Sequence, residues 1–237
     1  RRRRCRKGIC GIAVTHEPST HEWSWVAVTF FTVGTGYETE VQRFVKSAIE
    51  HRVRWMAYPK PQMGSWRANL NWKSSVILEA MADHPGRDIV WVDADGMFRS
   101  YPTLFDELSV CRAYDIALHR FKQSRLDPGK ELLSGTLWVA NTERGRDIVA
   151  RWDRYARAHP EIRHQKALDC VLRAERPDAR VFALPIEYCA IFDHPAVRGR
   201  IVPVIEHFQA SRRLRRQVGP PAGRPITMAT FTQRAKE

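Results

Sequence analysis

Two aspartates spaced by one residue form the strongest chemical signal in this sequence. The apolar run Ile89–Val92 leads directly into Asp93, Asp95 and Gly96. An uninterrupted apolar run is typical of a strand that is covered on both faces of a parallel sheet. Because an unpaired carboxylate is costly to bury, we expect the aspartates at the C-terminal end of that strand, where open α/β sheets bind their ligands.

The spacing of these aspartates favours a metal site. Side chains of residues i and i+2 of an extended chain lie on the same face, so Asp93 and Asp95 could point to one divalent cation. Carboxylate oxygens are ligands that Mg²⁺ and Mn²⁺ prefer. Gly96 would let the backbone turn tightly after them. The alternative is an ordinary polar turn that binds nothing.

The strand and the aspartates together, Trp91 to Asp95, resemble the DxD motif of GT-A glycosyltransferases. The chain is most similar to the small, retaining nucleotide-sugar transferases, the group that includes glycogenin-like enzymes. In that family the two aspartates bind a divalent metal, which holds the diphosphate of the sugar nucleotide. The resemblance covers Trp25 to Arg213. It implies an α/β fold with one GT-A domain, in which helices flank a mostly parallel central sheet.

The composition predicts one sizeable domain. The chain has 237 residues, of which 43% are hydrophobic. We expect a flexible basic arm at 1–22, a glycosyltransferase domain at 23–217 and a tail at 218–237. No apolar run approaches the ~20 residues of a membrane-spanning helix, and Ile9–Val14 is too short for a signal peptide. These features predict a soluble protein in the cytoplasm of a bacterium or of a virus-infected host cell, and they leave its oligomeric state open.

The cysteines favour reduced thiols over a disulfide framework or a zinc site. Their number is odd, they are scattered, and no two are spaced as Cys-x-x-Cys. They are Cys5, Cys10, Cys111, Cys170 and Cys189.

The net charge of +13, from 39 basic and 26 acidic residues, points to an anionic partner. Such an excess favours nucleic acid or an anionic membrane surface. Most residues of Arg1–Lys7 are basic, as in flexible arms that hold phosphates. The charge can also arise in two ways that need no such partner. An arginine-rich composition can reflect a GC-rich genome, and a nucleotide-sugar site needs positive charge of its own.

A strand, a glycine loop and a helix are predicted at 25–32, 34–36 and 37–51. The Gly-x-Gly of this loop lacks the third glycine of the dinucleotide fingerprint, which disfavours an NAD site. In the family that the chain resembles, this segment holds the nucleoside. The resemblance implies three donor-binding residues, Phe31, Thr32 and Tyr37. The alternative is an ordinary turn.

The segment 64–69, which leads into a helix expected through Met81, resembles another donor-binding part of the family. Trp66, Asn69 and Lys73 repeat a pattern in which a Lys or Arg contacts the donor. This resemblance implies a donor contact for Lys73. The alternative is a solvated surface lysine.

The strand expected at 132–140 resembles the strand that lines the sugar and acceptor pocket of the family. Ser134 and Gly135 match that segment and are implied to bind the donor. Leu133 replaces the usual Asn, so one hydrogen bond of the family is absent here.

Arg163–Asp169 resembles the Asp-Gln-Asp-Ala-Leu-Asn segment of the family. Gln165 agrees with it, which implies that Gln165 contacts the donor. His164 and Lys166 replace the two acids, so the contacts of those acids must change. Asp169 could substitute for one of them. No carboxylate can be assigned from the sequence as nucleophile or base with certainty. The candidates are Asp169, Glu187 and Asp193, of which we favour Asp169 and Glu187.

Glu206–Arg213 resembles a C-terminal His-Phe segment that completes the metal shell in similar enzymes. This implies that His207 binds the metal together with Asp93 and Asp95, because neutral imidazole is a good ligand for manganese. The alternative is a structural histidine. Arg212 and Arg213 would then lie near the diphosphate, where a cation could neutralise the leaving group.

The remaining pattern completes an α/β chain. We expect strands at 52–58, 115–121 and 181–186, helices at 103–108 and 142–159, and a turn at 123–130. Four arginines fall on the outer face of the long helix: Arg144, Arg151, Arg154 and Arg157. They predict a solvated face, or alternatively a patch that follows a nucleic-acid backbone.

These signals predict sugar transfer from a nucleotide sugar, with UDP-sugar as the first candidate and Mn²⁺ or Mg²⁺ as Lewis acid. From the charge we predict DNA carrying a hydroxymethylated pyrimidine as the acceptor, as in viral base-modifying glycosyltransferases. Such an enzyme must flip its base out or act on an open strand. Three alternatives remain: transfer to a bacterial surface glycan or lipid precursor, a nucleic-acid-binding module without catalysis, and a metal-dependent nucleotidyltransferase.

Overall fold

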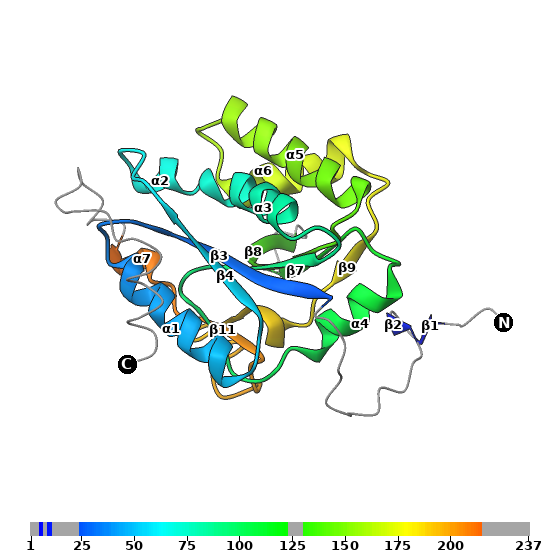
Figure 1. Ribbon diagram of the computed structural model, residues 1–237, viewed down its shortest axis with the longest axis horizontal. Helices are drawn as coiled ribbons and strands as arrows, with labels where there is room; N and C mark the ends of the chain where they lie inside the picture. Colours follow the sequence, from blue (N-terminus) through cyan, green and yellow to red (C-terminus); the bar gives the residue numbers. More distant parts are fainter. Residues whose placement is uncertain (1–4, 7–8, 11–23, 123–129, 215–237) are drawn as a thin grey trace.

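The computed structural model describes residues 5–6, 9–10, 24–122 and 130–214 (Figure 1). The expected tail, the turn at 123–129 and most of the expected basic arm lie outside the described residues. Within the arm, β1 (Cys5–Arg6) pairs antiparallel with β2 (Ile9–Cys10), where the sequence shows no period. None of the helices in these ranges is long and apolar enough to cross a membrane.

The domain is built on a six-stranded sheet in the order β4-β3-β5-β8-β7-β9 (Figure 1). The strands are β3 (Trp25–Thr32), β4 (Trp55–Lys60), β5 (Asp88–Val92), β7 (Ile116–Lys122), β8 (Lys130–Val139) and β9 (Val181–Ala183). Of these strands, β8 alone runs antiparallel to its neighbours. The predicted α/β fold with a mostly parallel central sheet is therefore confirmed.

Helices cover both faces of this sheet, because apolar side chains point to both sides of its central strands. Along β3, Trp25 and Ala27 belong to one core cluster and Val26 and Val28 to the other, and all four are fully buried. The first cluster includes α1 (Tyr37–Glu50) and α4 (Thr103–Cys111). The second includes α3 (Trp72–Asp83), α5 (Glu143–Ala158) and α6 (His164–Cys170), which lie together above the sheet in Figure 1.

A second, three-stranded sheet brings the C-terminal part of the domain to the two aspartates. β6 (Gly96–Phe98) pairs antiparallel with β11 (Ile205–His207), which also pairs with β10 (Ala190–Ile191). In this register His207 is the partner of Gly96. The residue after the second aspartate is therefore aligned with the predicted imidazole ligand.

Several boundaries differ from the sequence predictions. The segment 64–69, expected only to lead into the helix that runs through Met81, contains a short helix of its own, α2 (Trp66–Asn69), and a turn separates it from α3. The strand expected from residue 52 begins at Trp55, because Arg52 has a left-handed backbone with φ of 55°. After β9 the chain forms a 3₁₀ helix, η2 (Ile186–Cys189), where the strand was expected to end. The remaining helical segments are the π-helix η1 (Val171–Glu175) and α7 (Ser211–Leu214).

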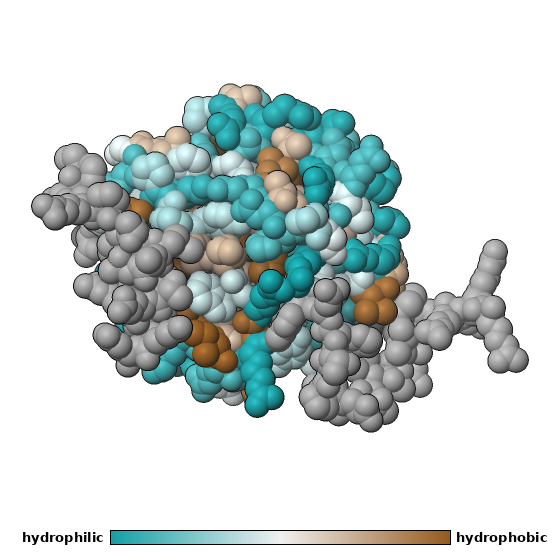
Figure 2. Space-filling view, in the orientation of Figure 1, coloured by the Kyte–Doolittle hydropathy of each residue, from teal (hydrophilic) through white to brown (hydrophobic). Residues whose placement is uncertain are grey.

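The arginines on the outer face of α5 mostly bind carboxylates. Arg151 lies 3.0 Å from Asp147 and 3.3 Å from Glu175, and Arg157 lies 2.7 Å from Asp153. The surface over this helix is mainly hydrophilic (Figure 2). This agrees with the solvated face predicted for α5. A phosphate backbone would have to displace these carboxylates from their arginines.

One buried carboxylate, at the start of β7, links three parts of the chain. The side chain of Asp115 has no exposed surface, and it accepts hydrogen bonds from Nε of Arg144 at 3.2 Å and from the amide of Arg180 at 2.9 Å. Burial by itself would raise the pKa of Asp115, but Arg180 and Arg144 hold it below its ordinary value. A depressed pKa means that the carboxylate stabilises the fold above pH ~4, and that this stability is lost as the pH falls through the folded-state pKa.

Asp115→Asn is expected to lower the free energy of unfolding by about 2 kcal/mol at pH 7, because charge-assisted hydrogen bonds to two arginines are lost. At pH 3.5 the loss of stability should be smaller, because the stabilisation by the wild-type carboxylate is itself reduced as the pH falls toward its folded-state pKa. Urea unfolding at both pH values measures the difference. Glu143→Gln, at an exposed carboxylate in the first turn of α5, is the control and should leave stability nearly unchanged at both pH values. An equal effect of Asp115→Asn at both pH values would contradict this account.

Candidate active site

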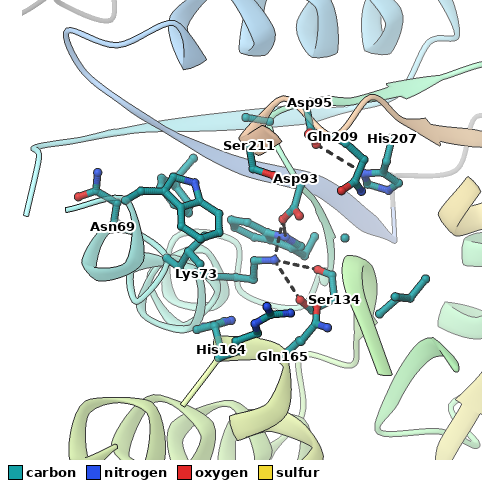
Figure 3. A pocket seen from close by; sticks show the side chains of 18 of the residues that line it. Asn69, Lys73, Asp93, Asp95, Ser134, His164, Gln165, His207, Gln209 and Ser211 are labelled. Carbon is teal, nitrogen blue, oxygen red and sulfur yellow. Dashed lines mark hydrogen bonds and ion pairs between the residues drawn. The ribbon is translucent and has the colours of Figure 1, made fainter. Parts of the chain in front are cut away.

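A cavity of about 610 Å³ lies at the ends of β3 and β5, beside the first residues of β8 and α6. Its wall contains every residue that the sequence predicts to bind the donor or the metal. These are Phe31, Thr32, Tyr37, Lys73, Asp93, Asp95, Ser134, Gly135, Gln165, His207 and Arg212. The fold therefore gathers these side chains in one place, and Figure 3 shows the central ones.

The two aspartates lie on a turn rather than on one extended strand. β5 ends at Val92, and the amide of Gly96 donates to the carbonyl oxygen of Asp93 at 2.7 Å. The prediction that Asp93 and Asp95 share one face of an extended chain is wrong, because the chain reverses within these residues. Each carboxylate consequently has its own set of partners.

Asp93 is held by a buried lysine. Nζ of Lys73 lies 2.6 Å from Oδ1 of Asp93, and it also donates to the carbonyl oxygen and to Oγ of Ser134, at 2.9 and 3.2 Å. Nε1 of Trp91 donates to the same Asp93 oxygen at 2.8 Å. Lys73 is only 5% exposed, which excludes a solvated surface lysine. Because an ammonium has three hydrogens, three oxygen partners satisfy it, and Lys73 here positions Asp93 and Ser134. A donor contact of Lys73 stays a prediction.

Asp95 and His207 form the second pair. Nδ1 of His207 lies 3.8 Å from Oδ1 of Asp95, and its Nε2 lies 2.8 Å from Oγ1 of Thr136. The amide of Ala210 donates to Oδ2 of Asp95 at 2.7 Å. Burial by itself lowers the pKa of His207, but the nearby Asp95 and Cys189 side chains outweigh it and raise the pKa above its ordinary value. A cation that binds this imidazole must therefore displace a proton.

Two glycines make room for the imidazole ring. A Cβ at Gly135 would lie 3.1 to 3.3 Å from three atoms of the His207 ring, and one at Gly96 would lie 3.1 Å from its Cε1. A Cβ at Gly96 would also overlap Cγ1 of Val92. Gly96 is therefore needed for close packing, whereas the sequence suggested a role in backbone turning.

The donor set of this wall suits a hard divalent cation. Two carboxylates and one imidazole are ligands that manganese accepts. In the part of the chain that the structure describes, no group of three His, Cys, Asp or Glu side chains is arranged to hold a metal ion. The structure brings Asp95 and His207 together, whereas Oδ1 of Asp93 is bound by Lys73. The predicted three-ligand site therefore stays a prediction.

Aromatic residues form another part of the wall. Nε1 of Trp66 donates to the hydroxyl of Tyr37 at 3.0 Å. Burial raises the pKa of Tyr37 to about 12, so the phenol is neutral at physiological pH. Phe31 and Thr32 are almost completely buried. Tyr37 and Trp66 thus offer aromatic surface and a neutral hydroxyl, while Phe31 and Thr32 mainly support the wall from behind.

The two arginines after β11 already bind carboxylates. Arg212 lines the cavity, but its guanidinium pairs with Asp193. Arg213 lies 2.5 Å from the buried carboxylate of Glu40. Neutralisation of a diphosphate by Arg212 stays a prediction, and it would require exchange of Asp193 for the phosphate.

The structure does not bring the two predicted catalytic carboxylates to the cavity wall. Asp169 is nearly buried and lies 2.7 Å from Arg120 and 3.0 Å from Arg173. These arginines hold its pKa below the ordinary value against the effect of burial. Glu187 lies in η2, and its carbonyl oxygen accepts from the amide of Val204 at 2.8 Å. Catalytic roles of Asp169 and Glu187 stay predictions, and for Asp169 such a role would require exchange of its arginine partners.

Comparisons with known proteins agree on the fold. The sequence matches no protein-family model and no curated protein. The structure is similar to that of a glycosyltransferase involved in the glycosylation of the major capsid of PBCV-1, with a TM-score of 0.59 over 90% of this chain and 98% of that chain, at 15% identity. It is also similar to the glycosyltransferase GlyE of Streptococcus pneumoniae TIGR4, with a TM-score of 0.53 and 14% identity, over 79% of this chain and 55% of that chain. The chain has the fold of these glycosyltransferases.

The wall contains two polar residues, Glu131 and His164, to which the sequence assigned no binding role. Oε1 of Glu131 accepts a hydrogen bond from Nε2 of Gln165 at 2.5 Å. His164 is 5% exposed, both of its ring nitrogens lack a hydrogen-bond partner among the described residues, and burial lowers its pKa well below the ordinary value. Glu131 could have been found from the matched segment, because alternate residues of a strand share a face and Glu131 lies two residues before Leu133, which also lines the cavity.

Proposed function

We propose that this protein transfers a sugar from a nucleotide-sugar donor, with UDP-sugars as the first candidates, to a hydroxyl acceptor. The observation that carries the proposal is the cavity. All residues matched to the donor and metal sites of a transferase family line it, in a fold shared with two glycosyltransferases. Its volume of about 610 Å³ is typical of small-molecule sites.

A divalent cation, Mn²⁺ or Mg²⁺, is part of the proposal. Asp95 and His207 would hold it, with Asp93 as the third ligand. When bound, the cation stabilises the negative charge that develops on the departing diphosphate. The protein prepares these ligands: the amide of Ala210 orients Asp95, and Lys73 orients Asp93.

The other residues of the wall bind and orient the donor. Tyr37 and Trp66 would contact the nucleoside, and Ser134 and Gln165 would contact the sugar. The acceptor hydroxyl attacks the anomeric carbon, its proton is lost, and the nucleoside diphosphate leaves. The family resemblance implies retention of configuration at that carbon.

Donor turnover tests the proposal. The protein is incubated with UDP-glucose, UDP-galactose, UDP-N-acetylglucosamine and GDP-mannose, each with Mn²⁺, and release of the nucleoside diphosphate is followed by chromatography. We expect turnover of at least one donor and its loss on chelation with EDTA. No release from any of these donors, together with no binding of UDP or GDP, would contradict the proposal.

DNA as the acceptor remains a separate proposal. Its support is the net charge of +13 and the basic residues of Arg1–Lys7, whereas the arginines of α5 are largely engaged by carboxylates. Binding to a duplex containing hydroxymethylcytosine should weaken steeply between 50 and 200 mM salt, because phosphate contacts release counterions. A gel shift without any affinity at low salt would rule out this acceptor.

Gly135→Ala is expected to lower metal-dependent turnover about tenfold or more, because the added Cβ pushes the His207 ring away from Asp95. Steady-state kinetics with a Mn²⁺ titration measure the loss. The matched comparison is the same substitution in a His207→Ala background. There it should have almost no further effect, since both changes act on one ring. Independent, multiplicative losses would show that Gly135 acts in another way.

A further inference from the structure

The cavity wall contains a hydrogen-bonded pair of residues from two elements that are far apart in the sequence. Nε2 of Gln165, in the first turn of α6, donates to Oε1 of Glu131 in β8 at 2.5 Å. Both residues line the cavity. Figure 3 shows Gln165 beyond Ser134, on the opposite side of the Lys73 ammonium from Asp95 and His207. The pair therefore lies away from the end at which the cation is proposed to bind.

The chemistry of this pair determines what it can recognise. An ionised carboxylate only accepts hydrogen bonds, so the amide of Gln165 must present its NH₂ group to Glu131. The carbonyl oxygen of the Gln165 amide is therefore on the side of the amide that faces away from Glu131. Carboxylate and carbonyl oxygens are both acceptors. A ligand that meets this pair is bound best if it carries hydrogen-bond donors such as sugar hydroxyls.

Glu131 also supplies a carboxylate next to the segment Arg163–Asp169, which lacks the two acids of the family pattern. In the segment that resembles the family, His164 and Lys166 stand where acids are expected. Asp169 forms an ion pair with Arg120 and is not part of the cavity wall. Among the described residues of the wall, Glu131 has the one carboxylate besides those of Asp93 and Asp95. Glu131, in β8, thus places a carboxylate beside Gln165 of α6.

We propose that Glu131 and Gln165 form the part of the site that binds the hydroxyl groups of the donor sugar, with Glu131 accepting from one hydroxyl and holding the amide of Gln165 in place. This inference rests on the proposed function. It assigns the transferred group as a neutral sugar with at least one free hydroxyl that faces β8 and α6. Glu131 is a specificity-determining residue in this assignment.

Calorimetry with Mn²⁺ tests this assignment on the wild type and on Glu131→Gln, which keeps the shape of the side chain and removes the charge. The ligands are UDP and the three UDP-sugars named above. Glu131→Gln should bind UDP as the wild type does, and should bind the preferred UDP-sugar about tenfold or more weakly. Gln165→Met should show the same selective loss. Glu143→Gln, an exposed carboxylate on α5, should change neither affinity.

The outcomes separate the two proposals. If the wild type binds neither UDP nor any UDP-sugar, the proposed function fails for these donors. If the wild type binds UDP and the UDP-sugars, but Glu131→Gln and Gln165→Met bind all of them normally, only the assignment of the pair is overturned. An equal loss of UDP and UDP-sugar affinity in these variants would also overturn it, since that result indicates a general structural role. Melting temperatures of the variants establish that each is folded.

Discussion

Asp95→Asn is expected to lower kcat/KM for metal-dependent sugar-nucleotide turnover by about 10²–10³-fold. The amide of Ala210 donates to Oδ2 of Asp95, and Oδ1 lies 3.8 Å from Nδ1 of His207. Asparagine has nearly the same shape, and its side-chain oxygen can still accept a hydrogen bond. It lacks the negative charge that attracts a divalent cation and that stabilises the protonated imidazole. The substitution therefore removes the charge with little change in packing.

Two measurements check this result. Steady-state turnover gives the loss of kcat/KM, and calorimetric titration with Mn²⁺ in the presence of UDP gives the loss of cation affinity. Asp178→Asn is the control, because this carboxylate is exposed and pairs with Arg144 outside the cavity. It should leave both quantities unchanged. Full metal-dependent turnover in Asp95→Asn would defeat the assignment of this residue as a ligand.

Gly145→Ala is expected to destabilise the fold by about 3–5 kcal/mol, the range of severe packing defects. Inside a helix this change normally stabilises a protein by about 1 kcal/mol. At this position in α5 the added Cβ would overlap the carbonyl oxygen of Ala140 and lie 3.1 Å from its carbonyl carbon. Both are backbone atoms at the end of β8, so they cannot rotate away. The clash reverses the usual sign of the substitution.

Urea unfolding, or the soluble yield where the variant is too unstable, measures this effect. Gly86→Ala is the matched control: its φ is +78°, and no atom of the described residues lies within 4 Å of an added Cβ. It should cost only the left-handed backbone strain of about 1–2 kcal/mol. If Gly145→Ala were as stable as the wild type, the close contact between α5 and the end of β8 would not exist as described.

Local patterns in the sequence predicted most helices and strands, and the family resemblance predicted their arrangement around a mostly parallel sheet. An apolar run such as 25–32 can be buried on both faces, and the amphipathic helix at 142–159 has one apolar stripe, so their secondary structure follows from periodicity. The boundaries were less predictable. The turn at 70–71 and the left-handed Arg52 are closed by local backbone hydrogen bonds, from the amide of Asn71 to Ala68 and from the amide of Val53 to Ala48, which periodicity does not record.

The side chains that the family resemblance matched to a donor site all line the cavity, because segments at the ends of neighbouring strands meet at one edge of the sheet. Their roles in binding stay predictions. The sequence could not determine which partner each charged side chain takes. Lys73 binds Asp93, Arg212 binds Asp193, and Gln165 donates to Glu131. Charged groups bind the nearest opposite charge in space, and those distances are set only when β6, β8, β11 and α6 pack together.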